Sequence, residues 1–367
     1  MHFLGVPTSR AVSLVTSDDL VLRDPLYDGH VVGEKASVVL RLAPSWFRIG
    51  SLEILTENGE HDLLRRLTDF IIGHHFRATI GLDDPDRLVR FFSLVQNRTV
   101  DLMVEWMSLG FAHGVCNTDN FSLLSITIDY GPFGFVDAYD PHFVPNLSDD
   151  TGMYALDRQP GVAYFNMRKL YQALRPILTE TQRADVKRAL KSFNDLYQAS
   201  LLRSFRRKLG LDGQHPDDSM LLASLLYLME ETRADFTMTF RQLADISLEE
   251  MRQSSVPSSL WALKELSGHR LFKKWMTAYY DRTVSGNRTL DDCERRQRMN
   301  RVNPRYVLRT WMAESAIRKA EQGDYSEIWR IHMVLQRPYE NQAVAEYSGY
   351  GSKPPAWSRA LKVSCSS

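Results

Sequence analysis

The sequence has little cysteine and no long apolar run. Its 367 residues include three cysteines, Cys116, Cys293 and Cys365, too few and too scattered for a disulfide framework or a zinc site. No stretch approaches the roughly 20 apolar residues that cross a bilayer, and the first residues lack the apolar core of a signal peptide. We therefore expect no disulfide-stapled secreted domain and no membrane span.

An excess charge of either sign is also lacking. The 45 basic and 45 acidic side chains balance, so no overall electrostatic field attracts nucleic acid or an anionic membrane. The apolar content of 44% is ordinary for a folded protein. The chain is long enough to bury a substantial core, and we expect no nucleic-acid partner.

Candidate chemistry is concentrated between His113 and Phe135. A polar, turn-like loop runs to Asn120, and the apolar, β-branched run Leu123–Ile128 predicts a strand or short hairpin. Asp129 follows at once, ahead of a turn-rich segment. A polar loop, short strands and then an acidic residue before a glycine are typical of kinase-like sites, where a loop Asn and the Asp of Asp-Phe-Gly chelate magnesium.

Spacing tests this interpretation. The kinase catalytic loop reads His-x-Asp, four residues, then Asn. A register that starts at His113 puts the Asn at Asn120 and the catalytic Asp at Val115, which cannot accept a proton. Asp119 is the remaining carboxylate of the loop, as a base or a second metal ligand. The alternative is a Ser/Thr/Asn loop joined to a buried hairpin, with Asp119 and Asp129 as turn formers.

A family resemblance favours the first interpretation. The segments HGVCNTDN, IDYGPFGF and YDP closely resemble the selenoprotein O family, kinase-fold proteins that act as protein adenylyltransferases. The resemblance runs from the first ten residues to the last four. Further matching segments are GVPTSRA (Gly5–Ala11), RLAPSWFRIG (Arg41–Gly50), QPGVAYFNMRKL (Gln159–Leu170), NPRYVLR (Asn303–Arg309) and the terminal SCSS.

The resemblance implies a fold, a reaction and a set of site residues. The fold would be α+β, with a protein-kinase-like catalytic domain followed by an α-helical one. The reaction would be transfer of AMP from ATP, bound flipped relative to kinases, to Ser, Thr or Tyr hydroxyls of proteins. Arg41 and Arg48 would contact the nucleotide phosphates, and Asn120 and Asp129 would hold Mg²⁺, with Mn²⁺ as the alternative cation. Asp129 would thereby also bind nucleotide, and Asp119 would orient or deprotonate the hydroxyl.

Two other functions stay open at this point. An ordinary protein kinase would transfer the γ-phosphoryl group with the same residues. A catalytically dead pseudokinase would serve as a binding module. For location, the resemblance implies a mitochondrion if the source is eukaryotic, although the first residues do not read as a transit peptide, and the cytoplasm is the alternative.

The sequence departs from the family pattern in two places. It has no Gly-x-Gly-x-x-Gly, and the sole lysine before Arg41 is Lys35, so the chain resembles an N-terminally shortened form and is expected to transfer little or no AMP as printed. Apolar faces at Val12–Val15 and Val38–Leu42 are then expected to be exposed. In the family the tail cysteine, here the redox candidate Cys365, pairs with a cysteine at the place of Pro145, so that disulfide is not expected.

Hydrophobic periodicity predicts the organisation. We expect a catalytic domain over residues 1–211 that lacks its first strands, a helical domain over 212–337 and an irregular tail over 338–367 that carries Cys365. Strands are predicted at Gly5–Val15 and Ala36–Leu42, with a polar loop over Ser17–Lys35 between them. The predicted helices are His61–Phe76, Asp86–Gly110, Tyr164–Leu178, Thr179–Gly210, Ser219–Met229, Thr237–Met251, Leu260–Asp281, Leu290–Asn300, Pro304–Gln322 and Ser326–Leu335.

Overall fold

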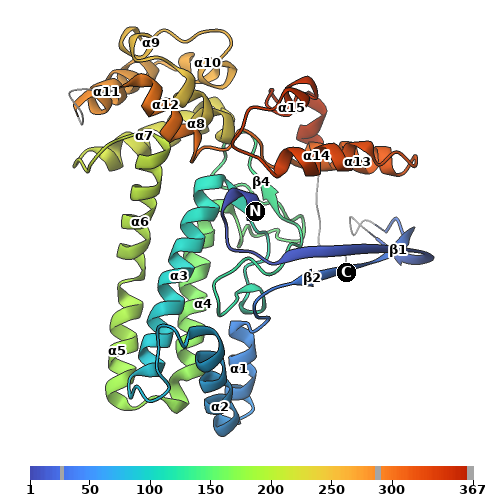
Figure 1. Ribbon diagram of the computed structural model, residues 1–367, viewed down its shortest axis with the longest axis vertical. Coiled ribbons are helices and arrows are strands. Elements are labelled where there is room, and N and C mark those ends of the chain that lie inside the picture. The colour runs from blue at the N-terminus through green and yellow to red at the C-terminus, as the bar shows by residue number, and fades with distance from the viewer. Residues whose placement is uncertain (25–28, 286–290, 362–367) are drawn as a thin grey trace.

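The computed structural model describes residues 1–24, 29–285 and 291–361. Within these residues the chain is mostly helical, with two small antiparallel sheets, β1–β2 and β3–β4, which confirms the α+β class (Figure 1). The strands are β1 (Arg10–Arg23), β2 (Val32–Leu42), β3 (Phe111–Ala112) and β4 (Gly134–Phe135). The α-helices are α1 (Ile49–Glu57), α2 (His61–Ile71), α3 (Arg87–Leu109), α4 (Gln159–Leu174), α5 (Glu180–Lys191), α6 (Phe193–Lys208), α7 (Asp218–Thr232), α8 (Phe236–Asp245), α9 (Leu248–Gln253), α10 (Trp261–Ser267), α11 (Phe272–Ser285), α12 (Asp292–Asn300), α13 (Thr310–Ala320), α14 (Ser326–Leu335) and α15 (Ala343–Tyr347).

The helix α3 is the centre of the first half. Its apolar residues recur at helical spacing and are buried, and it packs against α4, α5 and α6. Figure 1 shows α1 and α2 at one end of this bundle and α7 to α12 at the other. The helix ends at Gly110, and the chain passes through β3 directly into His113. A rigid, buried helix therefore delivers the chain to the candidate loop.

Three hydrophobic clusters hold the described residues together. The first runs from Val6 to Tyr197 and the second from Phe205 to Met299, while a small third cluster joins α13, α14 and α15. The clusters share elements, because Val307 packs into the first while Ala112 and Val136 pack into the second. The helical second half is thus packed directly on the segments that flank the candidate loop.

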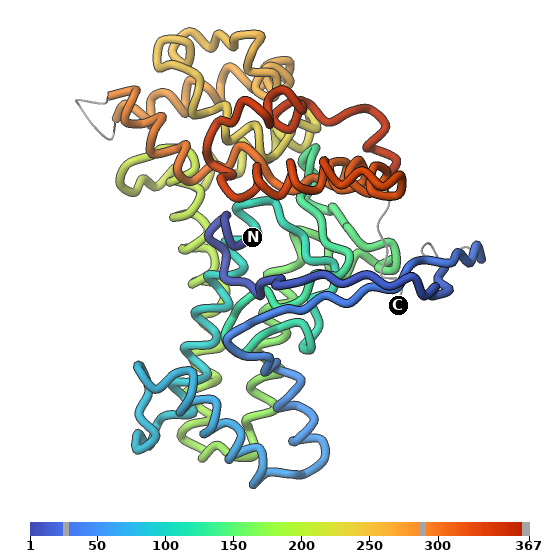
Figure 2. Tube along the Cα trace, turned by 45° about the vertical axis from the view of Figure 1, so that its right-hand side comes forward, coloured from blue at the N-terminus to red at the C-terminus, as the bar shows by residue number. Residues whose placement is uncertain are grey.

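The hairpin β1–β2 projects from this body (Figure 2). Its apolar side chains are exposed along both strands, among them Leu14 at 65%, Leu22 at 76% and Val38 at 70%. The expected exposure at Val12–Val15 and Val38–Leu42 is confirmed. The predicted loop over Ser17–Lys35 is wrong, since β1 continues to Arg23 and β2 begins at Val32. Cross-strand pairing extends the hairpin through a mixture of apolar and charged residues, such as Leu20 opposite Lys35 and Val21 opposite Glu34.

Several other predictions of local structure differ from what is observed. Leu123–Ile128 forms no regular strand: Ser125 N–H bonds to Ser122 O in a tight turn with Ser125 at φ 53°, and Phe121 pairs with Thr127 across it, which agrees in part with the alternative of a short hairpin. Three predicted helices are broken: Thr179–Gly210 at Ser192, Thr237–Met251 between α8 and α9, and Leu260–Asp281 between α10 and α11. A turn from Ser192 N–H to Ala189 O ends α5, and a capping box of Ser247 and Glu250 begins α9. The tail expected to be irregular contains α15 and the 3₁₀ turn Ala356–Ala360.

The remaining helix predictions agree with the structure to within a few residues, apart from Pro304–Gln322, where the helix begins later, at Thr310. After residue 220 the described part of the chain contains no strand. No helix among the described residues has the length and apolarity needed to cross a bilayer.

Candidate functional site

The loop after β3 is clamped by the helix α4. The Gln159 side chain donates to Phe111 O at 2.9 Å and accepts from His113 N–H at 2.8 Å. One turn or two further along, Asn166 donates to Cys116 O at 2.8 Å. Both amides are buried, and buried, fully directed hydrogen bonds of this kind fix backbone position. The loop His113–Cys116 is therefore held in place from its two ends.

His113 is the buried residue at the start of this loop. It is 1% exposed, stacks on Trp106 with ring centroids 5.2 Å apart, and accepts from Val115 N–H at 3.4 Å. Burial lowers the pKa of His113 to about 4, although the nearby Asp129 charge acts in the opposite direction. The imidazole is therefore neutral at physiological pH and serves as a packing and positioning group.

Gly114 lets the loop approach the segment that follows Asp129. Its φ is +83°, and a Cβ atom there would lie 2.3 Å from Pro132 O. Asn146 donates to Gly114 O at 3.3 Å from the same side. The loop, the turn after Asp129 and residues 145–146 thus form one packed layer.

Asn120 presents its carbonyl oxygen. Its Nδ2 donates to Val115 O at 3.0 Å, and its backbone N–H bonds to the Asn117 side chain at 3.1 Å. With the amide nitrogen committed, Oδ1 is the atom available to a cation. Val115 contributes its backbone carbonyl in this way.

Asp119 lies at the start of α1. A Cβ atom built on Gly50 would meet Asp119 Oδ1 at 2.2 Å, so the carboxylate occupies the space above this glycine. The Asp119 carboxylate is exposed and has no hydrogen-bond or ion-pair partner among the residues that the structure describes. A helix N-terminus favours negative charge, and an unpaired carboxylate is free to accept a proton or bind a cation.

Short antiparallel pairings bring the predicted residues together. Ile49 N–H bonds to Phe121 O and Leu123 N–H bonds to Phe47 O, each at 3.0 Å, so Arg48 runs beside Ser122. A second pairing joins Phe121 to Thr127. Asp119 and Asn120 directly precede Phe121, and Asp129 follows two residues after Thr127. The pairing of Phe121 with Thr127 therefore brings these two segments close together.

Arg41 and Asp129 form an ion pair. Arg41 Nη1 donates to Asp129 Oδ1 at 3.1 Å and to Ile128 O at 2.8 Å, and its guanidinium lies 5.2 Å from the Trp46 ring centre. The side chains of Arg41 and Asp129 are 36% and 37% exposed. Both groups are therefore oriented by the protein and still within reach of a ligand.

Arg48 differs from Arg41 in its contacts. Its backbone N–H donates to Ser51 Oγ at 3.2 Å at the start of α1. Its Nε is buried and has no hydrogen-bond partner in the described part of the chain. An unpartnered guanidinium nitrogen is costly unless a ligand or water satisfies it, which makes Arg48 a reasonable anion ligand.

The oxygen donors fit a hard divalent cation. Mg²⁺ is commonly held by one or two protein oxygen ligands together with substrate phosphates and waters. Asn120 Oδ1 and the Asp129 carboxylate are ligands of this kind, and Arg41 shares one oxygen of Asp129. Across the described residues, no group of three or more His, Cys, Asp or Glu side chains could hold a metal ion. The candidate ligands Asn120 and Asp129 would therefore share the cation with substrate phosphates and waters.

The two cysteines among the described residues are not joined to each other. Cys116 is buried, and burial raises the pKa of its thiol, whereas Cys293 is an exposed free thiol. The redox candidate Cys365 lies outside the described residues. Pro145, which stands in the place of the family cysteine, lines the same cavity as Leu361 of the tail.

Sequence reasoning missed the residues that position the site. Gln159 and Asn166 belong to a matching segment, QPGVAYFNMRKL, but received no role, and neither did Gly50 in RLAPSWFRIG. Arg309, also in a matching segment, is 1% exposed and ion-paired to Asp137 and Asp235. The available signal was a polar residue, such as Gln159 or Asn166, within a matching segment whose latter part is predicted to form a helix.

Comparisons with known proteins agree on one family. A family model described as protein adenylyltransferase SelO matches residues 1–336. The chain is similar to a protein nucleotidyltransferase YdiU from Xanthomonas campestris, with 40% identity over 373 residues that cover 100% of this chain and 71% of the relative. A YdiU protein from Burkholderia multivorans is 40% identical over 379 residues, covering 100% of this chain and 69% of the relative. A third, from Paraburkholderia xenovorans, is 40% identical over 376 residues, with 100% and 69% covered.

Proposed function

The chain belongs to the protein adenylyltransferase SelO family, and from this premise we propose that it transfers AMP from ATP to Ser, Thr or Tyr hydroxyls of proteins. Membership makes it a nucleotidyltransferase. ATP and a divalent cation are its proposed small-molecule partners, with Mg²⁺ as the cation. The catalytic part, over residues 1–211, is proposed to be kinase-like, with the helical part over 212–337 packed on it.

One observation supports the proposal above the others. The Arg41 guanidinium lies on the Asp129 carboxylate, next to the loop that carries Asp119 and Asn120. The proposed phosphate ligand Arg41 and the proposed metal ligands Asn120 and Asp129 thus lie on one partly exposed surface. Such a surface suits a reaction that depends on positioning the nucleotide and on neutralising the charge of its phosphates.

The reaction assigns each residue a task. An acceptor hydroxyl oxygen attacks the α-phosphorus, forms the new O–P bond and breaks the bond to the β-phosphate oxygen, so that pyrophosphate leaves. Asp119 accepts the hydroxyl proton, while Arg41 and Arg48 hold the phosphates through charge-assisted hydrogen bonds. Asn120 and Asp129 hold the cation, which when bound offsets the negative charge on the phosphates. His113 keeps the loop in register without exchanging protons.

The location of the protein is a separate proposal. The relatives named above come from bacteria, so they lend no support to a mitochondrial location, and the cytoplasm is the proposed site of action.

Labelled ATP tests the reaction. The chain is incubated with an acceptor protein and ATP labelled at the α- or the γ-phosphate, and the position of the transferred label, rather than the rate, decides. However slow the transfer is, we expect the incorporated label to come from the α-phosphate alone. Incorporation from the γ-label would identify a kinase, and the absence of both labels together with the absence of ATP binding would identify a binding module.

Asp129→Ala tests the site. Because the carboxylate is proposed to bind the cation and thereby the nucleotide, the variant is expected to lose Mg²⁺-dependent ATP binding, measured by calorimetric titration. Asp150→Ala, an exposed carboxylate elsewhere, is the matched control and should bind as the parent does. Unchanged ATP affinity in Asp129→Ala would rule this role out.

A further inference from the structure

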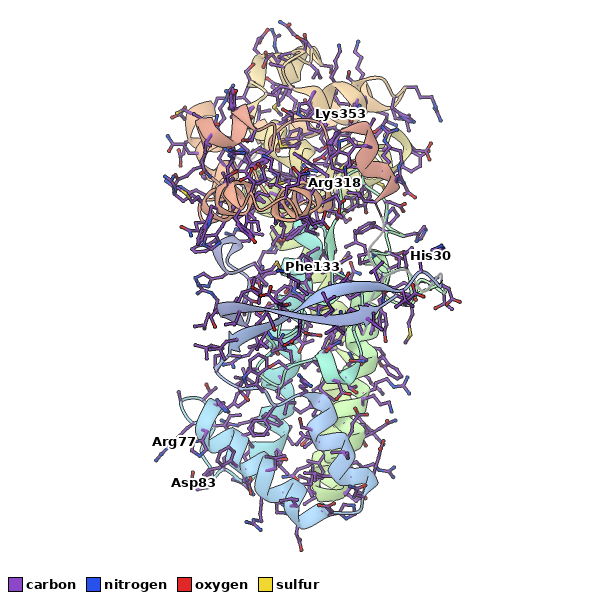
Figure 3. All side chains as sticks on the ribbon, turned by 90° about the vertical axis from the view of Figure 1, so that its right-hand side faces the viewer. His30, Arg77, Asp83, Phe133, Arg318 and Lys353 are labelled. Atoms are coloured by element: carbon purple, nitrogen blue, oxygen red, sulfur yellow. The ribbon has the colours of Figure 1, made fainter. Side chains whose placement is uncertain are left out.

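A cavity of about 630 Å³ lies beside the candidate site. Its walls come from residues 133–147 on one side, and from the α7–α8 junction, α10 and the tail on the other. Figure 3 shows Phe133 between the hairpin and the C-terminal helices, with Lys353 above it. We propose that this cavity binds an extended segment of the acceptor protein, including one large apolar side chain. The inference rests on the proposed function, whose substrate it would position.

The cavity wall touches the candidate catalytic loop. A Cβ on Gly114 would lie 3.2 Å from Pro145 of the wall, and Asn146 donates to Gly114 O at 3.3 Å. The ring centroids of Phe133, in the wall, and Tyr130 are 5.5 Å apart, and Tyr130 directly follows Asp129 in the chain. A segment bound here would therefore contact residues packed against the loop that carries Asp119 and the turn that follows Asp129.

The lining combines apolar surface with charged groups, as a stretch of polypeptide does. Phe143, Leu147 and Trp261 present apolar surface, and two carboxylates of the lining, Asp137 and Asp235, are both paired with Arg309. Ligand pockets typically combine apolar walls of this kind with a few fixed polar groups in a volume of about 300–1,000 Å³. A nucleotide or other polyanion would find no excess of positive charge here.

The rim can adapt to the partner. The pairs Arg233–Asp140 and Lys353–Glu265 belong to the lining; the two cations are 59% and 58% exposed, and the two carboxylates are 34% and 25% exposed. Ion pairs with a solvent-exposed partner are weak. They can therefore accept charged side chains that flank the apolar residue of the acceptor, without a strict sequence requirement.

A second cavity provides an internal comparison. It measures about 660 Å³ between α7 and α11 and is more apolar than the first, but no residue of the segment 113–147 lines it. Met220 is exposed on its wall as Leu147 is on the wall of the first cavity. Matched changes at these two positions separate acceptor binding from a general effect of adding charge to an apolar surface.

The experiment measures binding and transfer with one acceptor. Reduced, carboxymethylated lactalbumin, which is permanently unfolded, is labelled with a fluorophore, and its affinity for the chain is measured by anisotropy. Leu147→Glu is expected to weaken binding about tenfold or more, while Met220→Glu leaves it unchanged. Both variants should bind ATP with the parent affinity. Leu147→Ser repeats the test without an added charge and should weaken binding in the same direction.

Each outcome separates the two proposals. Equal acceptor affinity for the parent and both Leu147 variants would overturn the inference, and so would a parallel loss of ATP binding in Leu147→Glu. If acceptor binding depends on Leu147 but no α-label is transferred, the cavity stands as a polypeptide site and the proposed function fails.

Discussion

The space above Gly50 is filled by the Asp119 carboxylate, and this contact offers a test of Asp119 that leaves Asp119 in place. In Gly50→Ala the new methyl carbon would lie 2.2 Å from Asp119 Oδ1, so the carboxylate would have to move. The carboxylate can swing aside, so the fold should survive, and alanine favours the helix by up to about 1 kcal/mol. We expect a chain at least as stable as the parent with AMP transfer lower by on the order of a hundredfold.

Gly161→Ala is the matched control for this prediction. Gly161 also lies in the first turn of a helix, α4, and a Cβ there meets nothing within 4 Å. The control should gain similar stability in thermal unfolding and keep full transfer activity. Full activity in Gly50→Ala as well would show that the position of Asp119 does not matter to the reaction.

Among the elements, β4 and the start of α13 are connected through one buried side chain. Arg309 donates to Asp235 in a bidentate pair at 2.7 and 3.0 Å and also contacts Asp137, two residues after β4. Burial raises the pKa of Asp137 even beside Arg309. The C-terminal helices are thereby fastened to the segment that carries Asp129.

Arg309→Lys tests whether this connection positions the site. Lysine keeps the charge but loses the bidentate geometry, so stability should fall by up to about 3–5 kcal/mol. The affinity for ATP with Mg²⁺, measured by titration below the unfolding temperature, should fall as well, because the segment after Asp129 loosens.

Arg295→Lys supplies the comparison. Arg295 is equally buried, but its donors go to Leu243 O, Ile246 O and Asp292, all within the helical half. Its loss should lower stability and leave ATP affinity unchanged. Equal ATP affinities in the two lysine variants would mean that Arg309 is a structural brace with no effect on the site.

At the scale of the whole molecule, the hairpin β1–β2 is the least protected feature. It is long, two-stranded and apolar on exposed faces, and exposed apolar strand edges are sites of association. Val15 and Val38 are paired across the hairpin. Replacing them together, Val15→Glu with Val38→Lys, should reduce self-association in analytical ultracentrifugation. The free energy of unfolding should change by no more than about 0.5 kcal/mol, as for most surface substitutions.

A lone exposed apolar residue serves as the control for association. Ile54 on α1 is 57% exposed, and Ile54→Lys should leave the sedimentation behaviour as it was. Identical association in the parent, the hairpin variant and the control would place the associating surface elsewhere.

The sequence by itself determined most of the helices and placed the candidate metal-binding residues on one loop. The periodicity of α3 and the spacing from His113 to Asn120 depend on residues a few positions apart, and such patterns are readable without a structure. The same spacing showed that Val115 stands where a kinase has its base. The matching segments, spread along the chain, carried the family, and the comparisons agree with it.

The tertiary structure alone decided how these residues meet. Arg41 reaches Asp129 across 88 positions, and Arg309 reaches Asp137 across 172. Pairings of one or two residues, such as Arg48 with Ser122 and β3 with β4, leave no periodic trace. The extension of the hairpin beyond Thr16 and the placement of Asp119 over Gly50 likewise depend on contacts between distant residues. Local sequence sets local preference, whereas contacts of this kind form only when the whole core has been assembled.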